Sequence, residues 1–243
     1  MDFDFSNDQE QLRDAVRKWV DKGYTFERHN SIVREGGFSR AAWTELAELG
    51  LCGLYISEDH GGMGMGPTEG MLAMEELGRG IVMEPLAHAL IAGGVFSGYA
   101  PADVQAEWLP KVASGEALIV LAHQERKARY QLDKCEAKAT PAQAGWTLTA
   151  TKSIVPAGDQ ADAYLVPAMV DGTLAMFLVE RNASGVIAQG YGTQDGSRAA
   201  EVVFDNAAAT LVTRDGLTAL EHAVDIGIAA LCAEAVGVMD QTL

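Results

Sequence analysis

The spacing of apolar residues changes twice along this chain of 243 residues, and that change limits its fold more than any other feature. Up to about Gly115, apolar residues recur at helical spacing, as Leu12 and Val16 do. From there to about Val212 they alternate with polar residues or form short continuous runs, which is typical of strands. Helical spacing then returns until the chain ends. This order predicts an α+β fold and argues against a parallel sheet threaded by helices.

We therefore expect three domains. Residues 1–115 should form an N-terminal α-helical domain, a bundle, and residues 116–212 a middle antiparallel β-barrel or sheet. Residues 213–243 should form the first helix of an incomplete C-terminal helical domain. Ser6 and Gln9 fit a capping box, which supports a helix at the start of the chain.

The clearest turn in the middle segment is Asp171-Gly172, which lies between two apolar stretches, Ala163–Val170 and Leu174–Val179. Asp-Gly pairs favour the tight turns that join antiparallel strands. Trp146–Thr151 alternates apolar and polar residues, as a strand with one buried face does. These features predict antiparallel pairing in the middle domain.

The last segment is predicted to be one long amphipathic helix. Its large apolar residues recur every seven positions, and two more widen the stripe: Leu217, Val224, Leu231 and Val238, then Leu220 and Ile228. Such a stripe needs partner helices, and neither glycine nor proline follows Val238. We expect a truncated or split chain that lacks further helices.

Composition and charge exclude several classes of protein. A formal net charge of −16 argues against binding to nucleic acid or to an anionic membrane surface. The three cysteines lack metal-binding or disulfide spacing and the histidines are scattered, so we expect a reducing compartment and no metal site. The N-terminus is no signal peptide, and the best apolar run, Leu86–Phe96, is too short to span a membrane. We expect a cytoplasmic protein without membrane contact.

A glycine-rich loop at residues 61–66 joins two predicted helices. The second begins at Pro67 and ends in Glu-Glu-Leu-Gly-Arg at 75–79. Neither G-x-G-x-x-G nor a Walker lysine is present, so the loop is no nucleotide-binding motif. The combination of a Gly-Gly-x-Gly loop with a Glu-Glu-Leu-Gly-Arg helix end resembles the acyl-CoA dehydrogenase family, and the similarity extends from Phe5 to Leu243.

The resemblance implies a cofactor, a substrate and partners. Members of this family hold FAD between the middle domain and the C-terminal helices, and a glutamate removes the α-proton of an acyl-CoA while hydride leaves the β-carbon for flavin N5. FAD and an acyl-CoA are therefore the implied ligands, with electron-transfer flavoprotein or a similar acceptor. The implied assembly is a homo-oligomer, or a heteromer with a longer acyl-CoA dehydrogenase chain.

The family's first flavin-contacting segment, Thr-Glu-Pro followed by Ala-Gly-Ser, corresponds to the stretch that starts at Gln124. Gln124 replaces the threonine that hydrogen-bonds the flavin, and its amide still offers a donor and an acceptor. Tyr130 replaces the serine near the thioester arm. The resemblance thus implies cofactor contacts from Leu121, His123 and Gln124, and substrate contacts from Arg129 and Tyr130.

Arg126, Lys127 and Arg129 form the densest basic cluster of this acidic chain. The family's substrate channel reaches the surface near this point, so the cluster would suit a CoA phosphate. A solvated basic turn is the alternative.

The family's second flavin segment, Gly-x-Lys-x-Trp-Ile-Thr-Asn-Gly, matches here through Lys152 and Gly158. Ile154 stands at the tryptophan that packs on the flavin, and Pro156 at the threonine. An isoleucine can cover a flavin ring but provides no aromatic stacking. Both residues are expected to contact FAD.

No residue of this chain corresponds to the catalytic glutamate. The family places it late in the C-terminal bundle, or on the first bundle helix just before an arginine. At that second position this chain has Gly227 and Ile228. The acids nearby are displaced along the helix: Glu221, Asp225 and Glu234.

The sequence therefore predicts an FAD-dependent oxidoreductase that desaturates an acyl-CoA thioester and is incomplete as this chain. Two alternatives stay open. One is a non-catalytic partner subunit of a heteromeric acyl-CoA dehydrogenase. The other is a flavin monooxygenase on the same fold.

Overall fold

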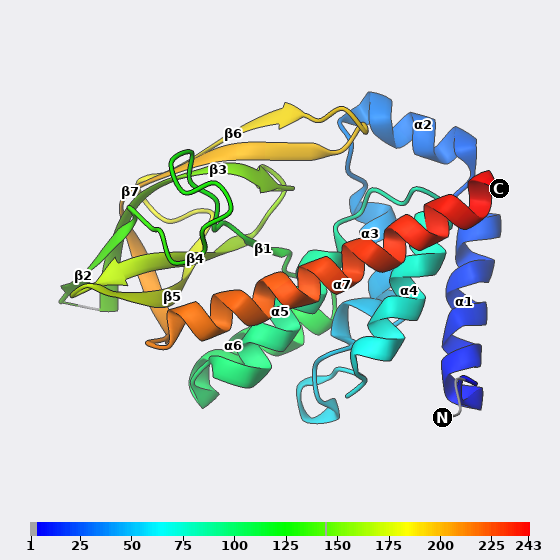
Figure 1. Cartoon of the computed structure of the whole chain (residues 1–243), viewed down its shortest axis with the longest axis horizontal. Coiled ribbons are helices and arrows are strands. Elements are labelled where there is room, and N and C mark those ends of the chain that lie inside the picture. Colours follow the sequence, from blue (N-terminus) through cyan, green and yellow to red (C-terminus); the bar gives the residue numbers. More distant parts are fainter. Residues whose placement is uncertain (1–3, 144) are drawn as a thin grey trace.

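The computed structural model describes residues 4–143 and 145–243, in which helices are followed by strands and then by one long helix (Figure 1). The first helices are α1 (Asn7–Gly23), α2 (Phe26–Glu35), α3 (Arg40–Glu48), α4 (Pro67–Arg79), α5 (Leu86–Tyr99) and α6 (Ala102–Ala113). The strands are β1 (Ile119–Leu121), β2 (Lys138–Ala142), β3 (Gly145–Pro156), β4 (Ala163–Val170), β5 (Thr173–Glu180), β6 (Val186–Gly192) and β7 (Arg198–Thr213). The last helix is α7 (Gly216–Thr242). The predicted α+β fold class is confirmed.

Several helices begin where the sequence supplies a cap. At α1, the Ser6 hydroxyl accepts the Gln9 N–H at 3.2 Å and the Gln9 side chain accepts the Ser6 N–H at 2.9 Å, so the predicted capping box forms. At α3, the Ser39 hydroxyl accepts the Ala42 N–H. Pro67 occupies the first turn of α4, where its missing N–H costs nothing.

The Glu-Glu-Leu-Gly-Arg motif ties α4 to α1. Glu76 is fully buried, and its carboxylate accepts hydrogen bonds from three guanidinium groups: Arg13 at 3.0 Å, Arg17 at 2.6 and 3.1 Å, and Arg79 at 2.9 Å. Burial alone would raise the pKa of Glu76, but the bonds from these arginines outweigh it and hold that pKa below its usual 4.5. The motif that carries the family resemblance therefore has a structural role.

The seven strands form one curled sheet with the order β1-β4-β2-β3-β7-β5, and β6 pairs with β7. Because β4 also pairs with β5, five of the strands close into a barrel. Asp171 and Gly172 make the predicted turn between β4 and β5, both with positive φ, 49° and 84°. Most pairs are antiparallel, but β1 and β2 each pair with β4 in parallel, which differs from the prediction.

Three elements have no counterpart in the sequence predictions: α2, β2 and β6. Helix α2 begins at Thr25, whose hydroxyl accepts the Arg28 N–H at 3.3 Å. This helix is short and has few apolar residues, and only one of its residues, Ile32, is buried. Strand β6 likewise has a largely exposed pattern.

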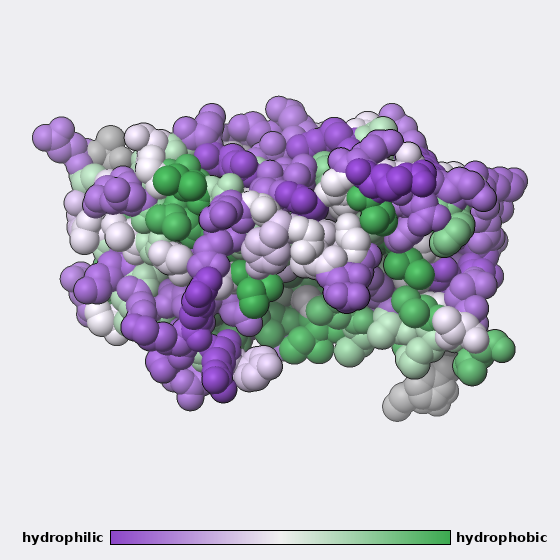
Figure 2. Space-filling model, turned by 90° about the horizontal axis from the view of Figure 1, so that it is seen from above, coloured by the Kyte–Doolittle hydropathy of each residue, from purple (hydrophilic) through white to green (hydrophobic). Residues whose placement is uncertain are grey.

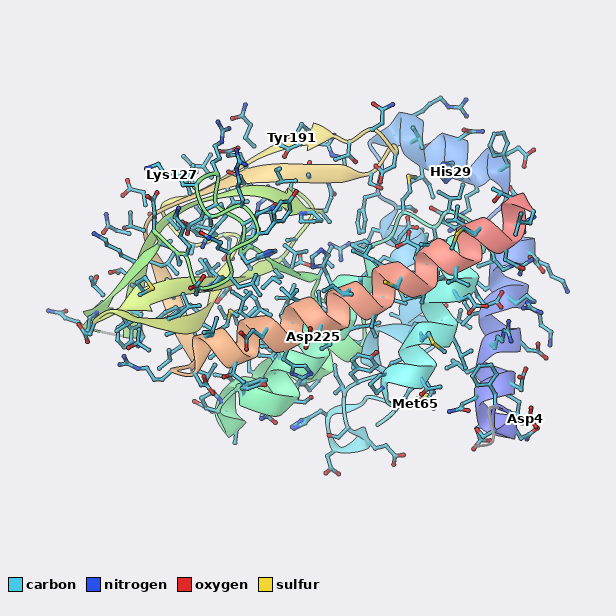
Figure 3. All side chains as sticks on the ribbon, viewed as in Figure 1. Asp4, His29, Met65, Lys127, Tyr191 and Asp225 are labelled. Carbon is cyan, nitrogen blue, oxygen red and sulfur yellow. The ribbon has the colours of Figure 1, made fainter. Side chains whose placement is uncertain are left out.

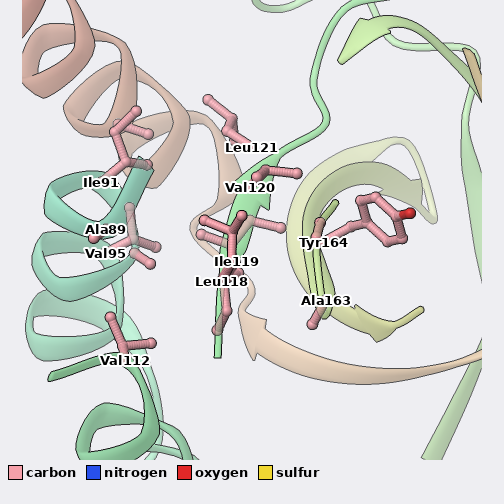
Figure 4. Packing of buried hydrophobic residues seen from close by; sticks show 14 of the residues in the cluster. Ala89, Ile91, Val95, Val112, Leu118, Ile119, Val120, Leu121, Ala163 and Tyr164 are labelled. Atoms are coloured by element: carbon pink, nitrogen blue, oxygen red, sulfur yellow. The ribbon is translucent and has the colours of Figure 1, made fainter. Parts of the chain in front are cut away.

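The helices and the sheet share one hydrophobic core. Ala89, Ile91 and Val95 of α5 face the strand segment that contains Ile119, and Tyr164 of β4 lies on its other side (Figure 4). The buried Tyr164 hydroxyl donates to the Gly158 carbonyl at 2.7 Å, so its polar atom is satisfied. This packing holds β1 against α5.

Helix α7 crosses the molecule from the sheet to α1 (Figure 1) and packs its small residues inward. Its buried residues are mostly small: Gly216, Ala219, Leu220, Ala223, Ala230, Ala233 and Gly237. Gly78 of α4 and Gly237 of α7 let the two backbones approach closely, since a Cβ at either position would overlap the opposite helix. Of the predicted stripe, Leu220 is buried but Leu217, Ile228 and Leu231 are exposed.

By length and composition, α7 is also the one helix among residues 4–143 and 145–243 that could span a membrane. This corrects the prediction that no segment reaches that length. Helix α7 packs against α4 and α5, but 22% of its apolar window is buried, so most of that window is open in this structure.

Candidate functional site

A cavity of about 700 Å³ lies where the helical part, the sheet and α7 meet. Its walls come from the α4–α5 connection, the ends of β1 and β3, the loop after β1, the β6–β7 turn and α7. Figure 2 shows a hollow with hydrophobic side chains on its floor on the face seen from above. The volume and the largely apolar lining are typical of cofactor and small-molecule sites.

The structure brings all seven predicted site residues to this one cavity: Leu121, His123, Gln124, Arg129, Tyr130, Ile154 and Pro156. They come from the end of β1, the loop that follows it and the end of β3. Four of them, Gln124, Arg129, Tyr130 and Ile154, also line an adjoining cavity of about 250 Å³. Their assigned roles stay predictions.

A buried ion pair holds the loop after β1 in place. Lys152 Nζ lies 2.7 Å from Glu125 Oε1, and it also donates to the Pro167 carbonyl at 3.0 Å. Glu125 in turn accepts the N–H groups of Glu136 at 2.6 Å and Ala137 at 3.1 Å. Burial opposes ionisation of Glu125, but the charge and hydrogen bond of Lys152 outweigh it, so its pKa is lowered.

The same ion pair sets the positions of Gln124 and Ile154. Gln124 directly precedes Glu125, and Ile154 lies two residues after Lys152. The Ser153 N–H donates to the Gln124 carbonyl at 2.8 Å. The Gln124 side chain makes no hydrogen bond to the described residues, so its amide is available to a ligand.

Ile154 is strained and exposed. Its φ is 52°, a left-handed conformation that a β-branched residue rarely adopts. It lies at an irregularity in the β3–β7 pairing, between Lys152 and Val155, and 58% of it is exposed. Strain of this kind is concentrated at ligand-binding positions.

Two neutral histidines, His88 and His123, line the cavity beside these residues. The Leu121 N–H donates to His88 Nδ1 at 3.3 Å, so the ring proton is on Nε2. Burial, with a smaller effect from His123, lowers the pKa of His88 to about 4. Burial and the charge of Lys152 also lower the pKa of His123. Both rings are therefore uncharged at neutral pH.

Only part of the predicted basic cluster is free of acidic partners. Arg126 pairs with Glu201 at 3.1 Å and Lys127 with Glu136 at 3.2 Å, both near the surface. Arg129 lines the cavity and makes no ion pair with the described residues. It is thus the member of the cluster that can meet an anionic ligand.

Helix α7 contributes Gly227, Ile228 and Glu234 to the cavity. Gly227 and Ile228 thus lie at the wall where the resemblance places a catalytic base and its arginine. Glu234 is on the same face, but seven residues further on, which is about 10 Å along a helix. Asp225 lies on the exposed side of α7 (Figure 3).

Six polar residues of the cavity could not be assigned to a site from the sequence: Glu84, His88, Thr193, Asp195, Ser197 and Arg198. Glu234 was recognised only as an acid displaced from the position of the base. For His88 a signal existed, since it is the one polar side chain in the apolar run 86–96. Asp195 and Arg198 lie in and beside the β6–β7 turn, and only the fold brings this turn to the cavity.

These features suit a flavin. Ile154 is an exposed apolar side chain at the cavity, and Gln124 presents an unpartnered amide beside it. An apolar cover and a polar hydrogen-bonding group are what a flat ring system with polar edges requires.

Comparisons with known proteins agree with the fold. The profile for the acyl-CoA dehydrogenase N-terminal domain matches residues 6–116. Acyl-CoA dehydrogenase FadE12 of Mycobacterium tuberculosis is 29% identical over 189 residues, which are 74% of this chain and 48% of that protein. The chain thus spans about half the length of the curated relatives it matches.

Two solved structures extend the similarity of fold to nearly the whole chain. The Tcur3481-Tcur3483 steroid ACAD G363A variant is 26% identical, with a TM-score of 0.87, over 96% of this chain and 64% of that one. A glutaryl-CoA dehydrogenase from Mycobacterium smegmatis in complex with FADH2 shares the fold at 20% identity and a TM-score of 0.82, over 96% and 62% of the two chains. The chain belongs to the acyl-CoA dehydrogenase family and holds its N-terminal domain, its middle β domain and one C-terminal helix.

Proposed function

We propose that this chain is a subunit of an FAD-dependent acyl-CoA dehydrogenase that desaturates an acyl-CoA thioester. The observation that carries the proposal is the convergence of seven residues, predicted from two separate sequence segments, on one cavity of about 700 Å³. FAD occurs in family members, including the M. smegmatis enzyme with bound FADH2.

When bound, FAD supplies the acceptor for the hydride that leaves the β-carbon. The chain's own contribution is to position ligands. Gln124 offers its free amide to a polar edge of the flavin, and Ile154 and Pro156 cover its ring. Arg129 is available to a CoA phosphate, and the Lys152–Glu125 pair keeps these groups in place.

We further propose that the subunit is completed by helices outside residues 1–243. They would cover the exposed apolar residues of α7 and supply the catalytic base, either from a continuation of this chain or from a longer homologous chain. The Tcur3481-Tcur3483 relative is a complex of two different family chains, which supports the second arrangement. We also propose a cytoplasmic site of action, with electron-transfer flavoprotein or a similar acceptor.

A non-catalytic partner subunit is the second candidate, and Gly227 with Ile228 favours it, because neither can act as a base. A flavin monooxygenase on the same fold has no observation of its own in its favour.

Reconstitution separates the candidates. The chain is purified alone and together with a longer acyl-CoA dehydrogenase chain from the same source, and flavin absorbance is recorded before and after anaerobic addition of acyl-CoA. The proposed subunit is supported if the flavin binds with contacts from Gln124 and if acyl-CoA bleaches that flavin in the assembly. A Gln124→Ala variant should lower flavin occupancy. A colourless chain whose Gln124→Ala variant supports full activity of the assembly would support the non-catalytic partner.

A further inference from the structure

Three carboxylates from three different elements line one end of the cavity. Glu84 belongs to the α4–α5 connection, Asp195 to the β6–β7 turn and Glu234 to α7. The turn reaches across to α2 (Figure 1), and Gly196 packs against Met83, the neighbour of Glu84. Burial raises the pKa of Glu234, and the negative charge of Asp195 adds to this effect. The cavity therefore has an acidic end.

Glu84 has one carboxylate oxygen in use and one without a partner. The side chain is 3% exposed, and its Oε1 accepts the Ser39 N–H at 3.1 Å. Its Oε2 is buried and has no partner at hydrogen-bond geometry among the described residues, although the Tyr24 hydroxyl is near. An unsatisfied buried carboxylate oxygen is costly, and such a group in a cavity wall indicates a site for a donor.

Glu234 is the most available of the three carboxylates. It is half-buried at the cavity wall and makes no hydrogen bond or ion pair with any described residue. Asp195, in contrast, accepts bonds from the Thr193 hydroxyl and the Ser197 N–H. Arg198 also lines the cavity, but its guanidinium is bonded to Asp159. No arginine or lysine of the described chain is paired with Glu234.

The acidic end is not a metal site. Among residues 4–143 and 145–243, no three His, Cys, Asp or Glu side chains come together in a way that could hold a metal ion. The expected ligand is therefore an organic group that donates hydrogen bonds.

The cavity has a basic and aromatic end, an acidic end, and an apolar wall between them. Arg129 and Tyr130 come from the loop over the sheet, whereas the carboxylates come from the side next to α2 (Figure 1). Between them the wall is largely hydrophobic: Met74, Leu77, Leu86, Ile91 and Leu231. This arrangement fits a ligand with an anionic head, an apolar stem and a donor at its far tip.

We propose that Glu234 and Glu84 make this cavity selective for acyl groups that carry a hydroxyl at the end remote from the thioester. The inference rests on the proposed function, because it takes the ligand to be an acyl-CoA. A hydroxyl can donate to the free carboxylate oxygens, a methyl end cannot, and a carboxylate end is repelled. The two glutamates are specificity-determining residues in this account.

The test uses the full chain and isothermal titration with three CoA thioesters of equal chain length: octanoyl-CoA, 8-hydroxyoctanoyl-CoA and 7-carboxyheptanoyl-CoA. A hydrogen bond to a charged group should make the hydroxylated thioester bind about tenfold more tightly than the carboxylated one. Equal affinity for these two, or a preference for the carboxylated one, would overturn the inference and leave the proposed function intact.

Glu234→Gln is the decisive variant, because it keeps the size of the side chain and removes its charge. It should reduce the hydroxyl-over-carboxylate preference to about threefold or less, mainly by tighter binding of the carboxylated thioester. Glu221→Gln makes the same charge change at an exposed position of α7 outside the cavity and should leave the preference unchanged. Equal effects of the two variants would overturn the inference. Failure of all three thioesters to bind, both to the chain alone and to the reconstituted assembly, would overturn the proposed function, and the inference with it.

Discussion

The ammonium group of Lys152 lies 2.7 Å from a carboxylate oxygen of Glu125, and both side chains are almost completely buried. The pair connects β3 to the loop after β1, and the two residues beside it, Gln124 and Ile154, line the cavity. The position of the predicted flavin contacts thus depends on one buried ionic contact.

Lys152→Met should destabilise the chain by about 3–5 kcal/mol, because it leaves the Glu125 carboxylate buried without its counter-ion. Urea unfolding followed by circular dichroism measures this. Lys127→Met removes an exposed partner of Glu136 and should cost less than about 1 kcal/mol. The double variant Lys152→Met/Glu125→Leu removes both charges. It should lower the free energy of unfolding by less than the sum of the two single changes. Similar stabilities for Lys152→Met and Lys127→Met would refute the prediction.

Acid should weaken the junction between α1 and α4. The pKa of Glu76 is lowered in the folded chain, so its contribution is present above the unfolded pKa of about 4.5 and is lost as pH falls through the folded pKa. Glu76→Gln should cost about 1–3 kcal/mol at pH 7 and progressively less below pH 4.5.

Glu84 and Glu234 have the opposite effect on how stability changes with pH. Burial raises both pKa values, so protonation of these two groups stabilises the fold as pH falls. The comparison of Glu76→Gln with wild type at each pH removes that shared effect. A constant difference between pH 7 and pH 3 would contradict the assigned role of Glu76.

Ile154→Gly should keep or raise stability and weaken flavin binding. Glycine accepts a φ of 52° without the steric cost of a β-branched residue, and little buried surface is lost at 58% exposure. We expect the free energy of unfolding to rise by up to about 1 kcal/mol, because the greater conformational entropy of glycine in the unfolded chain offsets part of the relieved strain. Ile187→Gly, in β6 and also exposed, lacks this strain and should destabilise by about 0.5–1 kcal/mol. Urea unfolding and FAD titration of both variants provide the readouts, and a clear loss of stability in Ile154→Gly would count against the strain.

The isolated chain should associate through the open face of α7. Leu231 and Met239 are exposed, and burial of such side chains contributes about 1.5–3 kcal/mol each. Leu231→Glu/Met239→Glu should shift the chain to monomer in light scattering at micromolar concentration. Ile187→Glu introduces one such charge at an exposed apolar position of β6 and should not cause this shift. A wild-type chain that is already a monodisperse monomer would disprove this prediction.

The sequence predicted most of the fold because local signals and burial agreed. The capping box at Ser6 and the Asp171-Gly172 turn form as expected. It missed α2, a short helix with three large apolar residues, of which Ile32 alone is buried. It did not identify the inner face of α7, which buries mainly small residues. Leu217, Ile228 and Leu231 of the predicted stripe, which was expected to need further helices, are exposed. Close packing depends on the opposite surface, here Gly78, which periodicity within one helix does not reveal.

The candidate site was predictable only where residues followed a family motif. Gln124 and Ile154 could be placed by register with such motifs. Glu84 and Asp195 could not, because they come from a helix connection and a hairpin turn that meet only in the folded chain. The ion pair of Lys152 with Glu125 was likewise invisible, although both residues matched the motifs.

We predict that this chain has no catalytic base at the cavity wall, and Gly227 offers a way to test this prediction. A Cβ at Gly227 would meet only Ile91 Cδ1 at 3.5 Å, an ordinary contact, so the position tolerates a side chain. Wild-type chain at saturating FAD should show no bleaching of the flavin band when acyl-CoAs of several lengths are added anaerobically. Gly227→Glu supplies a carboxylate at the wall and should accelerate bleaching by about 10²-fold or more over that baseline, since general bases contribute at that scale. Asp225→Glu changes an acid on the exposed side of the same helix and should stay at the baseline. Bleaching by the wild-type chain that is abolished in Glu234→Gln would show instead that Glu234 is the base, because no other described carboxylate of α7 lines the cavity.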